Sequence, residues 1–204
     1  MSSYLYLYSK PAIDDRLIPF WLGELARRHF RCELHPEFSF EQQAGYLSLK
    51  VRMVGGQLPN LDGKDYMIGF ELDVKPYDHQ TEMMEAANFA RELRVSGSPL
   101  WRRMLHLSRW DDLTPKPPRR LETKLRKTRW EMTVRAGMDN PLENAVIWEL
   151  MVVLAAVVDG VLFEPEQKKY YDGPLATERA QKLFGKFRTT PDEHSRLIPF
   201  EEWG

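Results

Sequence analysis

The sequence predicts a single α+β domain in which a mixed, mostly antiparallel sheet packs against a central buried helix. Residues 145–158 are apolar at every position except Glu149, and a helix with this composition must be buried on nearly all sides. Residues 46–53 and 68–74 alternate apolar and polar side chains, as strands with one covered face do. A chain of 204 residues without a low-complexity linker is long enough for one domain, spanning 1–204, with a sizeable core.

Both ends of the central helix are marked in the sequence. Asn140 is a predicted N-cap, Pro141 suits the first helical position, and Glu143 stands where a capping box requires it. Gly160 is predicted to end the helix in the left-handed conformation that glycine adopts most easily.

The central helix belongs to a predicted C-terminal strand-helix-strand unit. Residues 130–136 alternate as a strand before the helix, and residues 161–163 form an apolar strand after it. If these two strands are parallel in one sheet, the crossover between them should be right-handed.

The remaining predicted elements follow the same reasoning. Residues 46–53 and 68–74 should pair antiparallel, which sets Lys50 and Arg52 against Glu71 and Asp73 on the outer side. The other expected elements are a strand at 4–8, a helix from Asp14 to about Phe30, a strand at 32–40 broken at Pro36, and helices at 82–94 and 177–187.

Composition limits the class of protein. Hydrophobic residues make up 43% and charged residues 29%, which is globular, and the net charge of −1 gives no overall attraction to nucleic acid or membrane. Cys32 is the only cysteine, which fits a reducing compartment. No signal peptide is recognisable, and the longest apolar run is shorter than the roughly 20 residues of a membrane span, so we expect a cytoplasmic protein without membrane contact.

An acidic-basic motif in residues 68–75 suggests one enzymatic alternative. On a strand, Glu71, Asp73 and Lys75 share a face, where two carboxylates suit Mg²⁺ and a lysine suits an attacking water. The motif and the order of elements resemble the PD-(D/E)xK nucleases, which implies Mg²⁺-dependent cleavage of nucleic acid. That family needs a further acidic residue, for which Asp62 and Asp65 are the candidates, and an exposed sheet face produces the same spacing without any chemistry.

Positive charge is concentrated in one part of the chain. Residues 91–135 hold thirteen Lys or Arg and five Asp or Glu. The densest run consists of Arg119, Arg120, Lys124, Arg126, Lys127 and Arg129. This run is either a solvated segment or a surface for an acidic protein or a phosphate backbone, beside which Trp101 and Trp110 could stack bases. Trp130 alternates in step with core residues, so we expect it inside.

Other features allow a structural and a functional interpretation. His29, Cys32 and His35 have ligand-like spacing, but no fourth metal ligand is evident. Glu149 is expected either to have a partner such as an arginine of the sheet or to be partly exposed at the edge of the core, because a buried carboxylate must be paired, hydrogen-bonded or protonated.

A five-residue sequence occurs near both ends of the chain. The segment RLIPF occurs at residues 16–20 and again at 196–200. It is either a coincidence or a sign that the second copy competes for the groove used by the first.

The segment DGVLFEPE at residues 159–166, after a long apolar helix and before Tyr170 and Tyr171, resembles the ends of several small bacterial α+β proteins of unknown function. Some of these are immunity proteins of polymorphic toxin systems. The resemblance implies a non-enzymatic chain that binds a protein partner, a toxin in this case, by surface complementarity and needs neither a cofactor nor a metal.

Protein binding is therefore the leading functional prediction. Its expected surfaces are the basic run at 119–129 and an acidic set comprising Glu71, Asp73, Asp78, Glu82 and Glu85. The alternatives are the Mg²⁺-dependent nuclease and a nucleic-acid binder without catalysis.

Overall fold

A computed structural model of the chain describes residues 2–42, 44–54, 63–82, 84, 117–137, 141–188 and 198–203. Several predicted features lie outside these residues, namely Asp62, Glu85, Trp101, Trp110, Asn140, the first two residues of the second RLIPF copy and most of the 82–94 helix.

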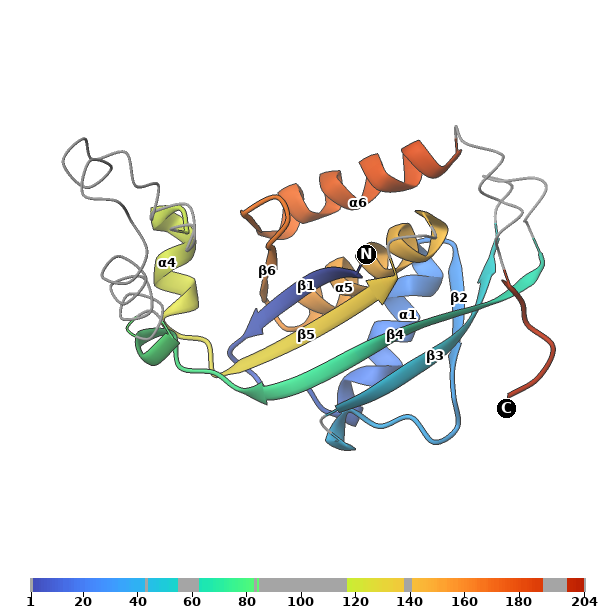
Figure 1. Cartoon of the computed structure of the whole chain (residues 1–204), viewed down its shortest axis with the longest axis horizontal. Coiled ribbons are helices and arrows are strands. Elements are labelled where there is room, and N and C mark those ends of the chain that lie inside the picture. The colour runs from blue at the N-terminus through green and yellow to red at the C-terminus, as the bar shows by residue number, and fades with distance from the viewer. Residues whose placement is uncertain are drawn as a thin grey trace, which may run out of the picture.

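The predicted α+β domain is built on one sheet. Its strands are β1 (Ser2–Ser9), β2 (Phe30–Leu34), β3 (Ala44–Met53), β4 (Asp65–Pro76), β5 (Trp130–Gly137), β6 (Val161–Glu164), β7 (Lys169–Tyr171) and β8 (Ile198–Pro199). Their order is β2-β3-β4-β5-β1-β6-β7, with β8 paired to β4 (Figure 1). All these pairs between described strands are antiparallel.

The strand-helix-strand unit is present in a modified form. Strands β5 and β6 run in the same direction, but they are not neighbours, because β1 lies between them and pairs antiparallel with both. The N-terminal strand therefore occupies the centre of the C-terminal unit, which ties the two ends of the fold together.

The helical segments are η1 (Asp15–Leu17), α1 (Ile18–Arg27), η2 (Phe40–Gln42), α4 (Arg119–Leu125), α5 (Pro141–Val157) and α6 (Gly173–Arg188). Helices α1 and α5 lie behind the sheet in Figure 1, and α6 packs against α5. Their apolar side chains join those of β1 to β5 in one large core. None of the described helices is long and apolar enough to cross a membrane.

The central helix is buried as predicted, but its end differs. Residue Asp159, with φ of 47°, takes the left-handed conformation that was expected of Gly160. Gly160 is needed for space, because a Cβ there would lie 2.4 Å from Leu7 Cδ1 and 3.0 Å from the Tyr8 carbonyl oxygen. The glycine therefore lets the chain pass close to β1 as it enters β6.

The first helix begins where the sequence predicts and ends earlier. Asp14 caps η1 by accepting a hydrogen bond from the Arg16 amide at 3.0 Å. Trp21 is fully buried and donates from its indole nitrogen to the Leu150 carbonyl at 2.8 Å. The helix stops at Arg27, and His29, with φ of 68°, turns the chain so that Phe30 starts β2 instead of ending α1.

A second, smaller core lies on the opposite side of the sheet. There α4 packs Leu121 and Leu125 onto Tyr8 and Val161. Helix α4 therefore covers one end of the sheet face that α1 and α5 leave open.

Candidate functional site on the outer face of the sheet

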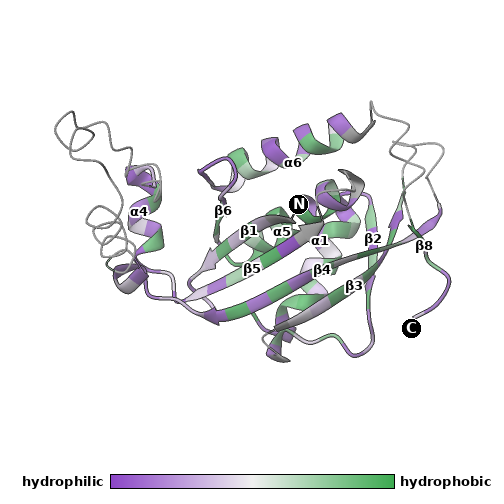
Figure 2. Cartoon of the chain, in the orientation of Figure 1, coloured by the Kyte–Doolittle hydropathy of each residue, from purple (hydrophilic) through white to green (hydrophobic). Residues whose placement is uncertain are grey.

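The two faces of the sheet carry different residues. On β4 the side chains from Tyr66 to Val74 that alternate toward α1 and α5 are buried, whereas Glu71, Asp73 and Lys75 on the other side are exposed. Figure 2 shows this alternation of hydrophobic and hydrophilic residues along the ribbon. The face opposite α1 and α5 is called the outer face here. Its central residues are Tyr46, Ser48, Lys50, Arg52, Asp65, Gly69, Glu71, Asp73, Lys75, Glu131, Thr133 and Arg135.

Tyr46 is the most prominent side chain at the centre of the outer face. It is 68% exposed, although it stands in the middle of a regular sheet. A Cβ on Gly69 of the neighbouring strand would lie 1.9 Å from the Tyr46 hydroxyl oxygen, so the ring lies directly over the glycine. Gly69 thus provides a flat seat that holds a large aromatic side chain in place while its other side faces solvent.

Carboxylates surround this tyrosine. Glu143, at the start of α5, accepts a hydrogen bond from the backbone N–H of Gly69, and burial raises the pKa of its carboxyl group. Burial, followed by the charges of Glu143 and Glu71, raises the pKa of the Tyr46 hydroxyl. A tyrosine hydroxyl is protonated at neutral pH and is able to donate a hydrogen bond.

Ion pairs link β4 to β5 beside Tyr46. Arg135 Nη1 donates to Glu71 Oε2 at 2.9 Å, and Lys75 Nζ lies 3.1 Å from Glu131 Oε1. The predicted pairing of Lys50 and Arg52 with Glu71 and Asp73 is wrong, because the register places Arg52 opposite Asp65 and Glu71 opposite Arg135.

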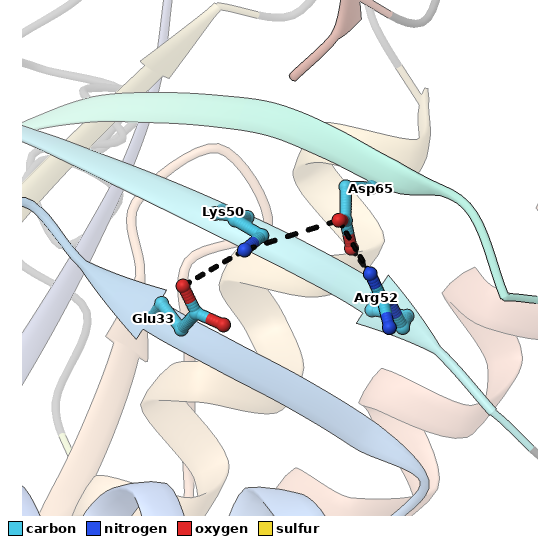
Figure 3. Close-up of polar contacts among 4 residues, drawn as sticks. All are labelled: Glu33, Lys50, Arg52 and Asp65. Atoms are coloured by element: carbon cyan, nitrogen blue, oxygen red, sulfur yellow. Dashed lines mark hydrogen bonds and ion pairs between the residues drawn. The ribbon is translucent and has the colours of Figure 1, made fainter. Parts of the chain in front are cut away.

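A chain of four charged side chains crosses the far end of the outer face (Figure 3). Lys50 Nζ lies 2.9 Å from Glu33 Oε2 and 3.8 Å from Asp65 Oδ2. Arg52 donates to both oxygens of Asp65, each at 2.6 Å, and this contact lowers the pKa of the Asp65 carboxyl group. These links hold β2, β3 and β4 together through their outer side chains.

The residues of the predicted nuclease motif lie on the same face. Glu71, Asp73 and Lys75 do share it, but Glu71 is paired with Arg135 and Lys75 with Glu131. Asp65 is on the same strand, eight residues and thus roughly 26 Å from Asp73. Among the residues that the structure describes, no group of three or more His, Cys, Asp or Glu could hold a metal ion.

Half of the basic run holds α4 in place. Arg120 lies 3.3 Å from Asp172, and Lys124 lies 2.6 Å from Asp159. Arg126 pairs with Glu122 within the helix at 2.6 Å. The exposed side chains of Arg119, Lys127 and Arg129 form no ion pair with another described residue, so the basic surface is smaller than the sequence suggests.

Aromatic side chains continue the outer face from α4 toward β7. Phe163 lies 4.4 Å from Tyr170 and 6.1 Å from Tyr6 between ring centroids, and Tyr8 lies 4.7 Å from Tyr77. Trp130 points to the other side and packs half-buried against the large core, as predicted.

Two further predictions concern the inner side. Glu149 is buried and its Oε2 accepts a hydrogen bond from Arg28 Nη1 at 2.9 Å, an arginine from the end of α1 and not from the sheet. Cys32 packs against the large core, where burial raises the pKa of its thiol to about 12. Among the described residues, no three His, Cys, Asp or Glu side chains form a group that could hold a metal ion. The His29, Cys32 and His35 side chains therefore do not converge.

Comparison with protein-family models, curated proteins and solved structures finds no match for this chain.

Sequence reasoning included Glu71 and Asp73 in the candidate surface but missed Tyr46 and Arg135. The available signal was an aromatic residue at a polar-face position of one strand and a glycine at a polar-face position of the strand that follows. The register that brings Tyr46 over Gly69 could not be derived from alternation alone.

Proposed function

We propose that this chain is a non-enzymatic protein-binding module that docks its partner on the outer face of the sheet. The observation that supports this most strongly is Tyr46, a large aromatic side chain fixed over Gly69 and 68% exposed. Tyrosine and arginine are the residues on which interface energy most often concentrates. Arg135 lies on β5, where it pairs with Glu71, the β4 residue opposite Tyr46.

The surroundings of Tyr46 suit a specific docking surface. Strands hold their side chains more precisely than loops do, so little conformational entropy is lost when a partner covers them. Exposed Glu71, Asp73 and Arg135 place both signs of charge around the aromatic ring, which favours one partner orientation over others.

Inhibition of a toxin is the specific form of protein binding that we propose. Its support is the resemblance of residues 159–166 to the ends of immunity proteins. An inhibitor of this kind covers a surface of its target, so a docking face without a reactive cleft is sufficient.

Two matched variants test the proposal. Tyr46→Ala removes the proposed anchor, whereas Glu178→Ala changes an exposed side chain of α6, away from the outer face. A partner captured by the parent chain should bind Tyr46→Ala at least about tenfold more weakly and Glu178→Ala unchanged. Equal binding of both variants would reject the outer face as the docking surface.

A co-expression assay tests the narrower role. The captured partner should stop growth when produced alone, and the parent chain should restore growth where Tyr46→Ala does not. If the captured partner does not stop growth, toxin inhibition is excluded, but protein binding is not.

Nucleic-acid binding is kept as a second candidate because Arg119, at the start of α4, and Lys127 and Arg129, just after its end, are exposed. Affinity for an oligonucleotide should then fall steeply with salt, and Lys127→Ala together with Arg129→Ala should reduce the slope. Absence of salt-dependent binding would remove this candidate.

A further inference from the structure

The segment 198–203 lies against the edge of the outer face that is furthest from α4. Strand β8 pairs with β4 at Tyr66 and Met67, beyond the residues of β4 that pair with β5 (Figure 2). The Phe200 amide donates to the Asp65 carbonyl oxygen at 3.0 Å, which extends the backbone contact by one residue. The segment thus adds a short strand where β5 leaves β4 uncovered.

Two aromatic side chains attach the segment to the face itself. The Phe200 ring centroid is 5.1 Å from Lys50 Nζ, at the centre of the charged chain in Figure 3. Trp203 packs edge-on against His35 at 5.3 Å and against Phe200 at 4.8 Å between ring centroids. Lys50, His35 and the β4 edge at 65–67 together form a seat for an extended segment, and we call these residues the strand seat.

The attachment is slight compared with the rest of the sheet. Only two residues of β8 pair with β4, whereas β3 and β4 pair over the full stretch from Arg52 with Asp65 to Ala44 with Asp73. No residue of 198–203 contributes to the large core, and Ile198 is 63% exposed. Elements held by few buried contacts open locally far more often than the fold as a whole unfolds.

We propose that the strand seat is an exchangeable peptide-binding site, occupied within the chain by residues 198–203. Its ligand is an extended partner segment with two aromatic residues three positions apart, as Phe200 and Trp203 are. The partner strand would pair with β4 and place its first aromatic over Lys50 and its second on His35. This inference rests on the proposed protein-binding function and adds the chemistry of the recognised segment.

Residues 198–203 already occupy the strand seat, and their local concentration determines the affinity that a competing segment needs. A segment tethered to its own site has a local concentration on the order of millimolar. Residues 198–203 fill the seat at that concentration only if their intrinsic dissociation constant is about a millimolar or lower. An untethered peptide of the same sequence should therefore bind in this range once the internal segment is weakened.

The test uses the full chain with Phe200→Ala and Trp203→Ala, which removes the two side-chain attachments and leaves the core untouched. A synthetic peptide of residues 196–203 is added up to several millimolar, and amide resonances are followed by nuclear magnetic resonance. We expect saturable shifts at Asp65, Tyr66 and Met67 in the variant. Binding to the parent chain should be weaker by about twofold or more, because the internal segment competes for the same site.

A control peptide with alanine at both aromatic positions should bind neither protein. Absence of shifts in the variant, equal binding by the parent chain, or equal binding of the control peptide would each overturn the proposal.

Hydrogen exchange on the unmodified chain provides a second measurement. The Phe200 amide should exchange at least about 100-fold faster than amides in the β3–β4 ladder, and equal protection would show that the segment is a fixed strand. Both experiments are independent of docking at Tyr46. A failed peptide titration therefore leaves partner capture intact, and a failed capture leaves the strand seat intact.

Discussion

The inner and outer faces of β4 differ although their residues alternate along one strand. Tyr66, Phe70 and Val74 on the inner face are buried in the large core, while Asp65, Glu71 and Lys75 on the outer face form ion pairs near solvent. The inner face supplies stability through apolar burial, which is roughly proportional to area. The exposed ion pairs of the outer face contribute less, because an exposed pair is worth about 0–1 kcal/mol.

Charged pairs show the same contrast. The Arg28–Glu149 pair lies beside α5 with a buried carboxylate, whereas Glu71 and Arg135 are each about half exposed. Removing one member of a buried pair leaves an unpaired charge, but an exposed charge is simply hydrated. The position of a pair therefore decides its importance more than its length, because both pairs are 2.9 Å long.

Shortening a buried side chain of the central helix should have the largest effect on the free energy of unfolding. Leu150→Ala removes a fully buried side chain and should lower the free energy of unfolding by about 2–5 kcal/mol. Ala156→Ser, at an exposed position of the same helix, is the control and should change it by less than about 0.5 kcal/mol. Urea denaturation measures both, and similar losses would contradict burial of this helix.

Loss of Arg28 should come next. Arg28→Ala leaves the buried Glu149 carboxylate without its partner. We expect the free energy of unfolding to fall by about 2–3 kcal/mol, less than for a fully buried pair because Arg28 is one-third exposed. Adding Glu149→Leu removes the unpaired charge, so the double variant should be more stable than Arg28→Ala. A double variant that is less stable than Arg28→Ala would show that the unpaired Glu149 charge is not the cause of the loss.

A titrating carboxylate on the outer face should give a smaller, pH-dependent effect. Burial beneath neighbouring side chains raises the pKa of Glu131 above its ordinary value of 4.5, against the opposing hydrogen bond from Lys75. A carboxyl group with a raised folded-state pKa stabilises the fold below pH 4.5, and that contribution is lost as the pH rises through the folded-state value. Glu131→Gln should therefore gain stability relative to the parent chain between pH 4 and pH 8. A constant or falling difference in denaturation midpoints would contradict this.

Breaking the exposed pair should have the smallest effect. Arg135→Ala should cost less than about 1 kcal/mol of folding stability, since both partners are half exposed. A double-mutant cycle with Glu71→Ala should give a coupling of about 0.2–1 kcal/mol. A coupling as large as the Arg28 effect would remove the distinction between the two faces.

Periodicity predicted several elements but not their partners. It missed α4 and β7, and the strand predicted at 32–40 is β2 at Phe30–Leu34. Alternation predicted β3, β4 and β5, and the apolar run predicted α5, because one-dimensional patterns report which face is covered. Strand register, the insertion of β1 between β5 and β6, and the choice of Arg28 for Glu149 depend on contacts between distant segments. Asp159, not Gly160, is the left-handed residue, and Gly160 is needed instead for the close approach to Leu7 and Tyr8.

The candidate site was less accessible to sequence reasoning than the fold. Glu71 and Asp73 were found because charge on a strand face is visible in the pattern. Tyr46 was missed because an exposed aromatic and a buried one look alike until the neighbouring Gly69 is placed beside it.

Photocrosslinking tests the outer face most directly. A benzophenone amino acid is incorporated at position 46 in one protein and at position 178 on α6 in another, and each is irradiated with the captured partner. The account predicts a covalent adduct from position 46 and none from position 178. An adduct from position 178 alone, or equal yields from both, would contradict docking on the outer face.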